Sequence, residues 1–195
     1  MTSTPSARQQ ELMELAYGYV LERGLAELSL RPLAAAIGSS PRVLLFLYGS
    51  KDGLVRALLA RARTAELDYL ARLRTSYGGR QGLDEVAREV WGWLAADEHQ
   101  ALLKLWVEAY GRSLIDPAGP WSGFARSTVD DWLDLLAESQ PPAERHTAEG
   151  SAQRTLVLAV LRGALLDLLA TGDVRRTTGA VDAFLAGRQA AHSES

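Results

Sequence analysis

A short stretch of the chain gathers hydroxyl, guanidinium and ammonium groups around two predicted helix starts. Ser39 and Ser40 stand just before Arg42, and Lys51 follows one helix later. Guanidinium and hydroxyl groups form hydrogen bonds with phosphate oxygens and base edges, and arginine binds guanine through both O6 and N7. An ammonium group at a helix N-terminus faces a phosphate together with backbone N–H groups. These residue types favour binding of a polyanion over bond-breaking chemistry.

Helix-capping and helix-ending residues on both sides of Gly38 predict two short helices joined by a tight turn. Ser29 is a good N-cap residue, because its hydroxyl can accept a hydrogen bond from an unpaired backbone N–H. Apolar residues then recur at helical spacing as far as Ile37. Pro32 falls in the first turn, where its missing N–H costs little. Gly38 stands where a helix commonly ends in a left-handed residue.

The second short helix is expected to begin after Ser40, with Pro41 at its first position, and to run to about Tyr48. A glycine then ends it, Ser50 is the next N-cap, and Lys51 opens a third helix. A pair of short helices of this kind fits the major groove of DNA. An ordinary helical corner is the alternative, but several capping signals in register favour the helix-turn-helix.

Double-stranded DNA is therefore the predicted partner. We expect Arg42, together with Arg31, to contact base edges or phosphates, and Phe46 to pack on a thymine methyl group or a sugar. Lys51 is expected to contact a phosphate from a helix N-terminus. The full set of candidate DNA-binding residues is Ser29, Arg31, Ser39, Ser40, Arg42, Phe46 and Lys51.

The same stretch resembles the N-terminal DNA-binding domain of the TetR (tetracycline-repressor-like) family. The resemblance covers about residues 8 to 56, and its matching segments are 22–25, 28–31, 33–34, 38–40 and 48–54. It implies a repressor that binds a near-palindromic operator as a homodimer and is released by a small-molecule effector. One departure is clear. The family often has an aromatic-His-Phe run late in the recognition helix, and here the run reads Phe46, Leu47, Tyr48.

Length and composition are typical of an all-α globular protein. The chain has 195 residues, of which 47% are hydrophobic and 23% charged, and strong helix formers dominate between the glycines and prolines. We expect about nine helices, with a helix-turn-helix DNA-binding domain over 1–50 and a helical effector-binding and dimerisation domain over 51–195. Outside the motif, the expected helices cover about 6–23, 51–76, 83–96, 98–114, 121–139, 143–170 and 174–190, with a loop and hinge at 77–82.

Net charge, cysteine content and the N-terminal sequence further limit the class of protein that this chain can be. The net charge is −3, with +1 over residues 1–60 and −4 over the remainder, so the predicted DNA-binding part is only weakly basic. The absence of cysteine excludes a disulfide framework, a thiolate nucleophile and cysteine-based zinc sites. The polar N-terminus lacks the apolar core of a signal peptide, which is compatible with a cytoplasmic location.

The helix expected over 143–170 is apolar almost all round, interrupted by Arg162 and Asp167. These charged residues interrupt the apolar run too often for a membrane-spanning helix. A helix that is apolar on every side must be covered on every side, and a second subunit could supply part of that cover. The alternative is a helix central to its own domain. The candidate interface residues are Leu158, Leu161, Arg162, Leu165, Leu169 and Phe184.

All five tryptophans lie between residues 91 and 132. Aromatic side chains could line an apolar cavity for a small-molecule effector, with Glu108, Arg112 or Asp131 as orienting groups. Large aromatics also fill ordinary protein cores, and that alternative stays open. The candidate ligand-binding residues are Trp91, Trp106, Tyr110, Trp121, Phe124 and Trp132.

Signals for catalysis are weak. The three histidines, His99, His146 and His192, are far apart in the sequence, and the chain has neither a His-Glu-x-x-His run nor a Gly-x-Ser-x-Gly elbow. We therefore predict no enzyme activity, no metal site and no cofactor. The rival hypotheses are a helical small-molecule carrier or enzyme that uses the aromatic segment, and a dimeric interaction module without DNA binding.

Overall fold

The structure is a computed structural model that describes residues 7–25, 28–77 and 82–193. Within those ranges every regular element is helical, which confirms the predicted all-α class. The elements are α1 (Ala7–Arg23), α2 (Leu30–Ala36), α3 (Pro41–Tyr48), α4 (Lys51–Tyr77), α5 (Leu83–Leu94), the 3₁₀ turn η1 (Asp97–His99), α6 (Gln100–Ile115), α7 (Phe124–Ser139), α8 (Ala148–Thr171) and α9 (Val174–Ser193).

The chain forms two compact units that do not follow the chain order. The first comprises residues 1–67 and 101–125, as far as they are described, and the second comprises 68–100 and 126–195. Helix α4 contributes to both units. The division that the sequence predicts after residue 50 is one of expected function, with DNA binding before it and effector binding after it. That division stays a proposal. By packing, the start of α4 and nearly all of α6 belong with the N-terminal helices.

The core of the first unit explains that grouping. Apolar side chains from α1, α2 and α3 pack with the first four turns of α4, and Leu105, Ala109, Trp121 and Phe124 complete the same cluster. The start of α4 is also held to α1 by a two-pronged ion pair, in which Arg61 donates to Glu14 over 2.7 and 3.0 Å. That hydrogen bond lowers the pKa of Glu14.

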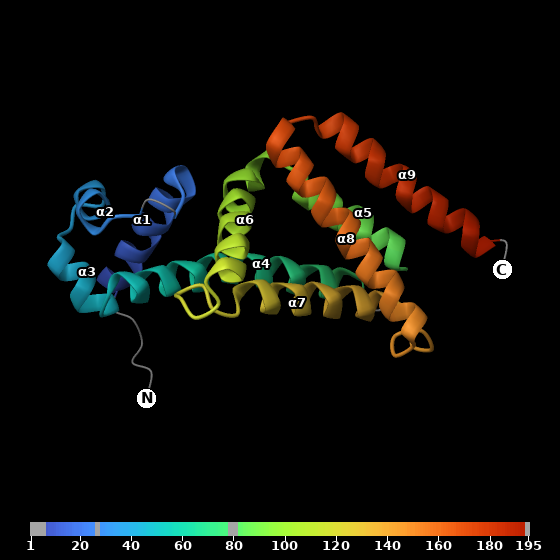
Figure 1. Ribbon diagram of the computed structural model, residues 1–195, viewed down its shortest axis with the longest axis horizontal. Helices are drawn as coiled ribbons and strands as arrows, with labels where there is room; N and C mark the ends of the chain where they lie inside the picture. The colour runs from blue at the N-terminus through green and yellow to red at the C-terminus, as the bar shows by residue number, and fades with distance from the viewer. Residues whose placement is uncertain (1–6, 26–27, 78–81, 194–195) are drawn as a thin grey trace. The chain divides into compact units, whose positions relative to one another are not determined.

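The second unit is built on an antiparallel pair, α8 and α9, which lie side by side (Figure 1). Helix α5 packs against both of them. The Trp91 indole on α5 donates a 3.0 Å hydrogen bond to Thr178 on α9, and Arg188 on α9 donates to Asp84 on α5 over 2.6 Å. The turn between α8 and α9 is fixed by Gly172, which has φ 70° and ends α8 in the left-handed region.

Three helix boundaries differ from the sequence prediction. Helix α8 begins at Ala148, not near residue 143, because Thr147 caps it by accepting from the Gly150 N–H. Helix α7 begins at Phe124, after a run of turns from 117 to 123. Helix α5 ends at Leu94 and η1 follows it. Most of the predicted hinge, residues 78–81, lies outside the described residues.

No single helix among the described residues is both long and apolar enough to cross a membrane, although the bent pair of α2 and α3 passes the same length and composition test together.

Two helical glycines make a matched test of packing at the corner between α3 and α4. A Cβ at Gly53 would collide with the carbonyl oxygen of Tyr48, whereas a Cβ at the exposed Gly18 would meet nothing within 4 Å. We expect Gly18→Ala to stabilise the protein by up to about 1 kcal/mol through its helix propensity. Gly53→Ala should instead destabilise it, and denaturant unfolding measures both. Equal shifts for the two variants would contradict this packing.

Candidate nucleic-acid interface

The turn between α2 and α3 has a fully hydrogen-bonded form. Gly38 has φ 63°, the Ser39 N–H donates to the Ala34 carbonyl over 2.8 Å, and the Gly38 N–H donates to the Ala35 carbonyl. These two bonds form the Schellman motif that ends a helix on glycine. The chain direction changes by 104° between the two helices, within the range of helix-turn-helix pairs.

The N-cap serines of α3 and α4 form the hydrogen bonds that the sequence predicts, whereas the N-cap serine of α2 does not. Ser40 Oγ accepts from the Val43 N–H at 3.3 Å, with Pro41 at the first helical position. Ser50 Oγ accepts from the Gly53 N–H at 2.9 Å. Ser29 has the extended backbone of an N-cap, but its hydroxyl makes no capping hydrogen bond, so that part of the prediction is wrong.

Helix α3 has one buried side and one exposed side. Leu44 is buried in the core of the first unit and faces inward. The opposite side carries Arg42, Val43, Leu45 and Phe46, all of which are exposed. We call these four residues the reading face. Phe46 is 86% exposed, which is extreme for an aromatic residue.

The candidate DNA-binding residues from the sequence lie at the start of α2, in the turn after it, on α3 and at the start of α4. All are exposed except Ser39, which is half-buried. Lys51 occupies the first position of α4, next to the end of α3. Their exposure leaves them accessible to a duplex, and their contacts with DNA remain predictions. Sequence reasoning missed Val43 and Leu45, although the inward position of Leu44 on the helical wheel would have indicated them.

Tyr48 does not supply a hydroxyl to this surface. Its Oη is buried without a hydrogen-bond partner in the described part of the chain, and burial raises the pKa of the phenol. The last turn of α3 therefore presents apolar atoms outward and directs its one phenol inward.

Helix α6 contacts the turn before α2 through one carboxylate. Glu108 Oε2 accepts from the Leu25 N–H at 2.9 Å, beside Gly24, which has φ 78°. Glu108 was predicted only as an orienting group for an effector. The structure instead gives it a position on the helix-turn-helix unit, which sequence reasoning could not find because 83 positions separate the two residues.

The six predicted ligand-binding aromatics are divided between the two units. Trp106 and Tyr110 stack at 5.1 Å in the first unit, where Trp121 and Phe124 are buried in the core. Trp91 and Trp132 are buried in the second unit. In the second unit, Trp93 lies 4.4 Å from the rings of both Tyr69 and His99, and Trp132 lies 6.4 Å from the same Tyr69 ring.

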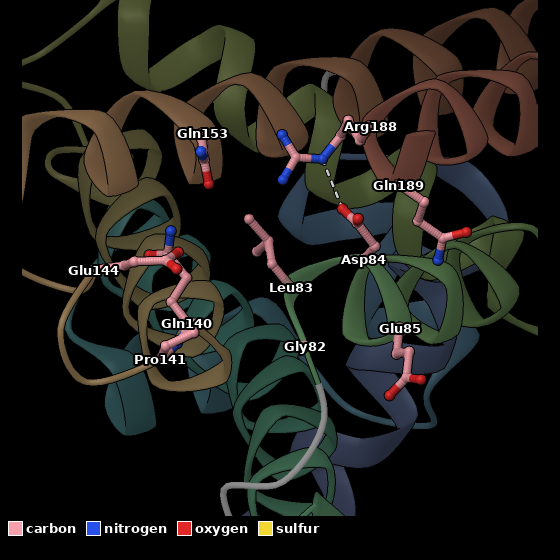
Figure 2. A pocket seen from close by; sticks show the side chains of 10 residues that line it. All are labelled: Gly82, Leu83, Asp84, Glu85, Gln140, Pro141, Glu144, Gln153, Arg188 and Gln189. Atoms are coloured by element: carbon pink, nitrogen blue, oxygen red, sulfur yellow. Dashed lines mark hydrogen bonds and ion pairs between the residues drawn. The ribbon is translucent and has the colours of Figure 1, made fainter. Parts of the chain in front are cut away.

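The second unit also has a hollow with a volume of about 360 Å³, lined by α5, the segment after α7, α8 and α9. Figure 2 shows the Asp84–Arg188 pair at one side and Gln153 directed toward the space. Gln140, at the opposite side, donates to the Gly150 carbonyl over 2.9 Å. Most of the lining residues are polar or charged, and none of them is a predicted aromatic residue.

The residues predicted for a dimer interface divide by burial. Leu158, Leu161 and Leu165 are buried within the second unit itself. Arg162, Leu169 and Phe184 are half-exposed. The side of α8 that faces solvent carries other apolar residues, Leu156 and Leu166, each 51% exposed.

The comparisons with known proteins give matches at the level of structure. No model of a known protein family matches the chain, and no curated protein matches it in sequence. A TetR-like transcriptional regulator from Rhodococcus sp. RHA1 is 24% identical, with a TM-score of 0.64 over 97% of this chain and 99% of that one. A TetR transcription regulator from Haloarcula marismortui ATCC 43049 is 18% identical, with a TM-score of 0.64 over 89% of this chain and 92% of that one.

A third similar structure is the multidrug binding protein EbrR in complex with imidazole. It is 24% identical, with a TM-score of 0.64 over 91% of this chain and 89% of that one. These matches cover between 89% and 97% of the chain. The chain has the fold of TetR-family transcriptional regulators. Within this TetR-like fold, α3 is the second helix of the helix-turn-helix, and its last turn is more apolar than the aromatic-His-Phe run common in the family.

The two serines at the helix starts give a matched test of this local geometry. Ser40→Ala removes an observed capping hydrogen bond, so we expect a loss of about 1 kcal/mol in the free energy of unfolding. Ser29→Ala removes no such bond and should cost less than half of that. Urea unfolding without DNA measures both, and a larger loss for Ser29→Ala would contradict the cap assignment.

Proposed function

We propose that the protein is a DNA-binding transcriptional regulator, a ligand-responsive repressor that binds a near-palindromic operator as a homodimer. The observation that carries the proposal is the exposed reading face on a capped helix-turn-helix, with Arg42 on it and Lys51 beside it. Helix α3 would enter the major groove with Arg42 toward the base edges, while Lys51 contacts a phosphate at the N-terminus of α4. Ser29, Arg31, Ser39 and Ser40 would contact the flanking backbone.

Two-fold symmetry of the operator requires two copies of the chain. The outward sides of α8 and α9 suit a four-helix contact between subunits, because exposed leucines on α8 adjoin small residues such as Gly163, which is exposed. The half-exposed Arg162, Leu169 and Phe184 would lie at its edge. This proposal moves the interface away from the buried leucines of the sequence prediction and onto Leu156 and Leu166.

Release from DNA by an effector would need a link between the two units. Helix α4 runs without a break from Lys51, which follows α3 after two residues, into the second unit, so a ligand that shifts α4 would move the reading face. A coupling free energy of about 1–3 kcal/mol changes affinity several-fold to over a hundredfold. The neighbour EbrR binds imidazole, which supports a small-molecule effector here. The protein would act as a regulator and not as an enzyme, in the cytoplasm.

A salt series on operator binding tests the DNA contacts. Lys51→Ala should weaken binding to every sequence alike and lower the slope of log K against log salt by about 0.9 per subunit, because one phosphate contact is lost. Arg42→Ala should reduce the preference for the operator over unrelated DNA, by roughly 1–3 kcal/mol for each lost guanine contact. If both variants bind as the unchanged protein does, the interface is assigned to the wrong residues.

Analytical ultracentrifugation of variants in which glutamate replaces an exposed leucine tests the proposed contact between subunits. Leu166→Glu places a carboxylate at the centre of the proposed interface and should convert the dimer into a monomer at micromolar concentration. The control is Leu114→Glu on α6, where the leucine is 65% exposed and has no proposed partner. That variant should remain dimeric, and a dimeric Leu166→Glu would contradict the proposed interface.

The rival function is a helical small-molecule-binding protein without DNA binding. A dimeric interaction module without DNA binding is the other alternative, and the exposed apolar run that includes Leu45 and Phe46 supports it, because this run lacks the polar groups usual on a DNA-reading surface. Filter binding of the protein to its own upstream DNA at low salt separates the proposed function from both alternatives, since each of them predicts no retention.

A further inference from the structure

The reading face is unusual because it carries three apolar side chains and one charge. Val43 and Leu45 are each 40% exposed and Phe46 is 86% exposed, all on one eight-residue helix. Single exposed apolar residues are ordinary on protein surfaces, but three on one side of a short helix form a patch that needs a partner.

Helical geometry places these three side chains around Arg42. Phe46 is one turn after Arg42 and shares its side of the helix, while Val43 and Leu45 flank the pair on either side. A step of three residues rises about 4.5 Å along a helix, which is more than the spacing of about 3.4 Å between base pairs, so side chains three residues apart can reach different base pairs. Val43 and Phe46 can therefore meet neighbouring base pairs while Arg42 contacts a guanine.

The charges around the patch indicate what covers it. Arg42 lies within it, Lys51 lies just beyond its C-terminal end, and the hydroxyl of Ser40 lies at its N-terminal end. Cations and hydroxyls around an apolar strip are complementary to a DNA groove, in which the phosphate backbones flank the base edges. In the major groove, the one apolar group that bases present is the C5-methyl of thymine.

Resting on the proposed function, we infer that the reading face recognises thymine methyl groups, so that each operator half-site carries thymines at the base pairs facing Val43, Leu45 and Phe46. The weak charge of the first sixty residues, +1, fits this assignment. With few phosphate contacts available, apolar contacts to bases must supply a larger share of the specific affinity.

Replacement of thymine by deoxyuridine tests this inference directly. An operator is first selected from random duplexes, and then synthesised with deoxyuridine in place of the half-site thymines. The two duplexes have the same charge and the same base-pairing hydrogen bonds, and differ only in the methyl groups. Since one buried methyl is worth about 0.8 kcal/mol, we expect affinity to fall roughly fourfold for each contacted methyl. Deoxyuridine outside the half-sites should have no effect.

Two variants connect the effect to the helix. Phe46→Ala, at an exposed position that the fold does not need, should lose the roughly fourfold preference due to the methyl facing position 46 and keep the preference due to Val43 and Leu45. Lys51→Ala should bind both more weakly but keep the preference for thymine. Circular dichroism of each variant confirms that the helices are retained.

Each result has a definite meaning. Equal binding of both duplexes by the unchanged protein, with the selected operator still preferred over random DNA, overturns this inference and leaves the proposed function standing. No duplex retained at low salt overturns both. If Phe46→Ala alters only self-association and not the thymine preference, the patch contacts protein and the inference is wrong.

Discussion

The orientation of α3 about its own axis decides which side chains a partner can reach, and one buried contact sets that orientation. Leu44 is held in the core of the first unit, so the four residues of the reading face must point away from it. The Schellman turn at Gly38 and the Ser40 cap fix where the helix begins, and Gly49 with φ 77° fixes where it ends. Core packing and backbone hydrogen bonds thus place the reading face before any ligand is bound.

The same logic shows why the helix-turn-helix could be predicted from the sequence. Its signals are local, because glycine conformation, proline position and serine caps act within a few residues. Both ends of α3 and the start of α4 were predicted at the residues observed. The failure at Ser29 is also local, since a correct backbone conformation does not require the hydroxyl to donate or accept.

The other features of the fold depend on contacts between residues far apart in the sequence, and their prediction from the sequence was weaker. Burial of Leu158, Leu161 and Leu165 inside the second unit depends on α5 and α9, which the pattern of α8 alone does not reveal. The tryptophans adjoin in the sequence but are divided between units, since Trp106 and Trp121 pack with the first unit and Trp91 and Trp132 with the second. The bond from Leu25 to Glu108 carries no sequence signal at all.

Directed cleavage of DNA tests most directly the claim that the reading face lies in the major groove. The chain has no cysteine, so Phe46→Cys provides a single attachment point for an iron chelate, and Leu114→Cys, at an exposed position on α6 outside the reading face, provides the control. The account predicts strand cleavage centred on both operator half-sites from position 46 and none above background from position 114. Equal cleavage patterns from the two positions, or no cleavage near the operator from position 46, would contradict it.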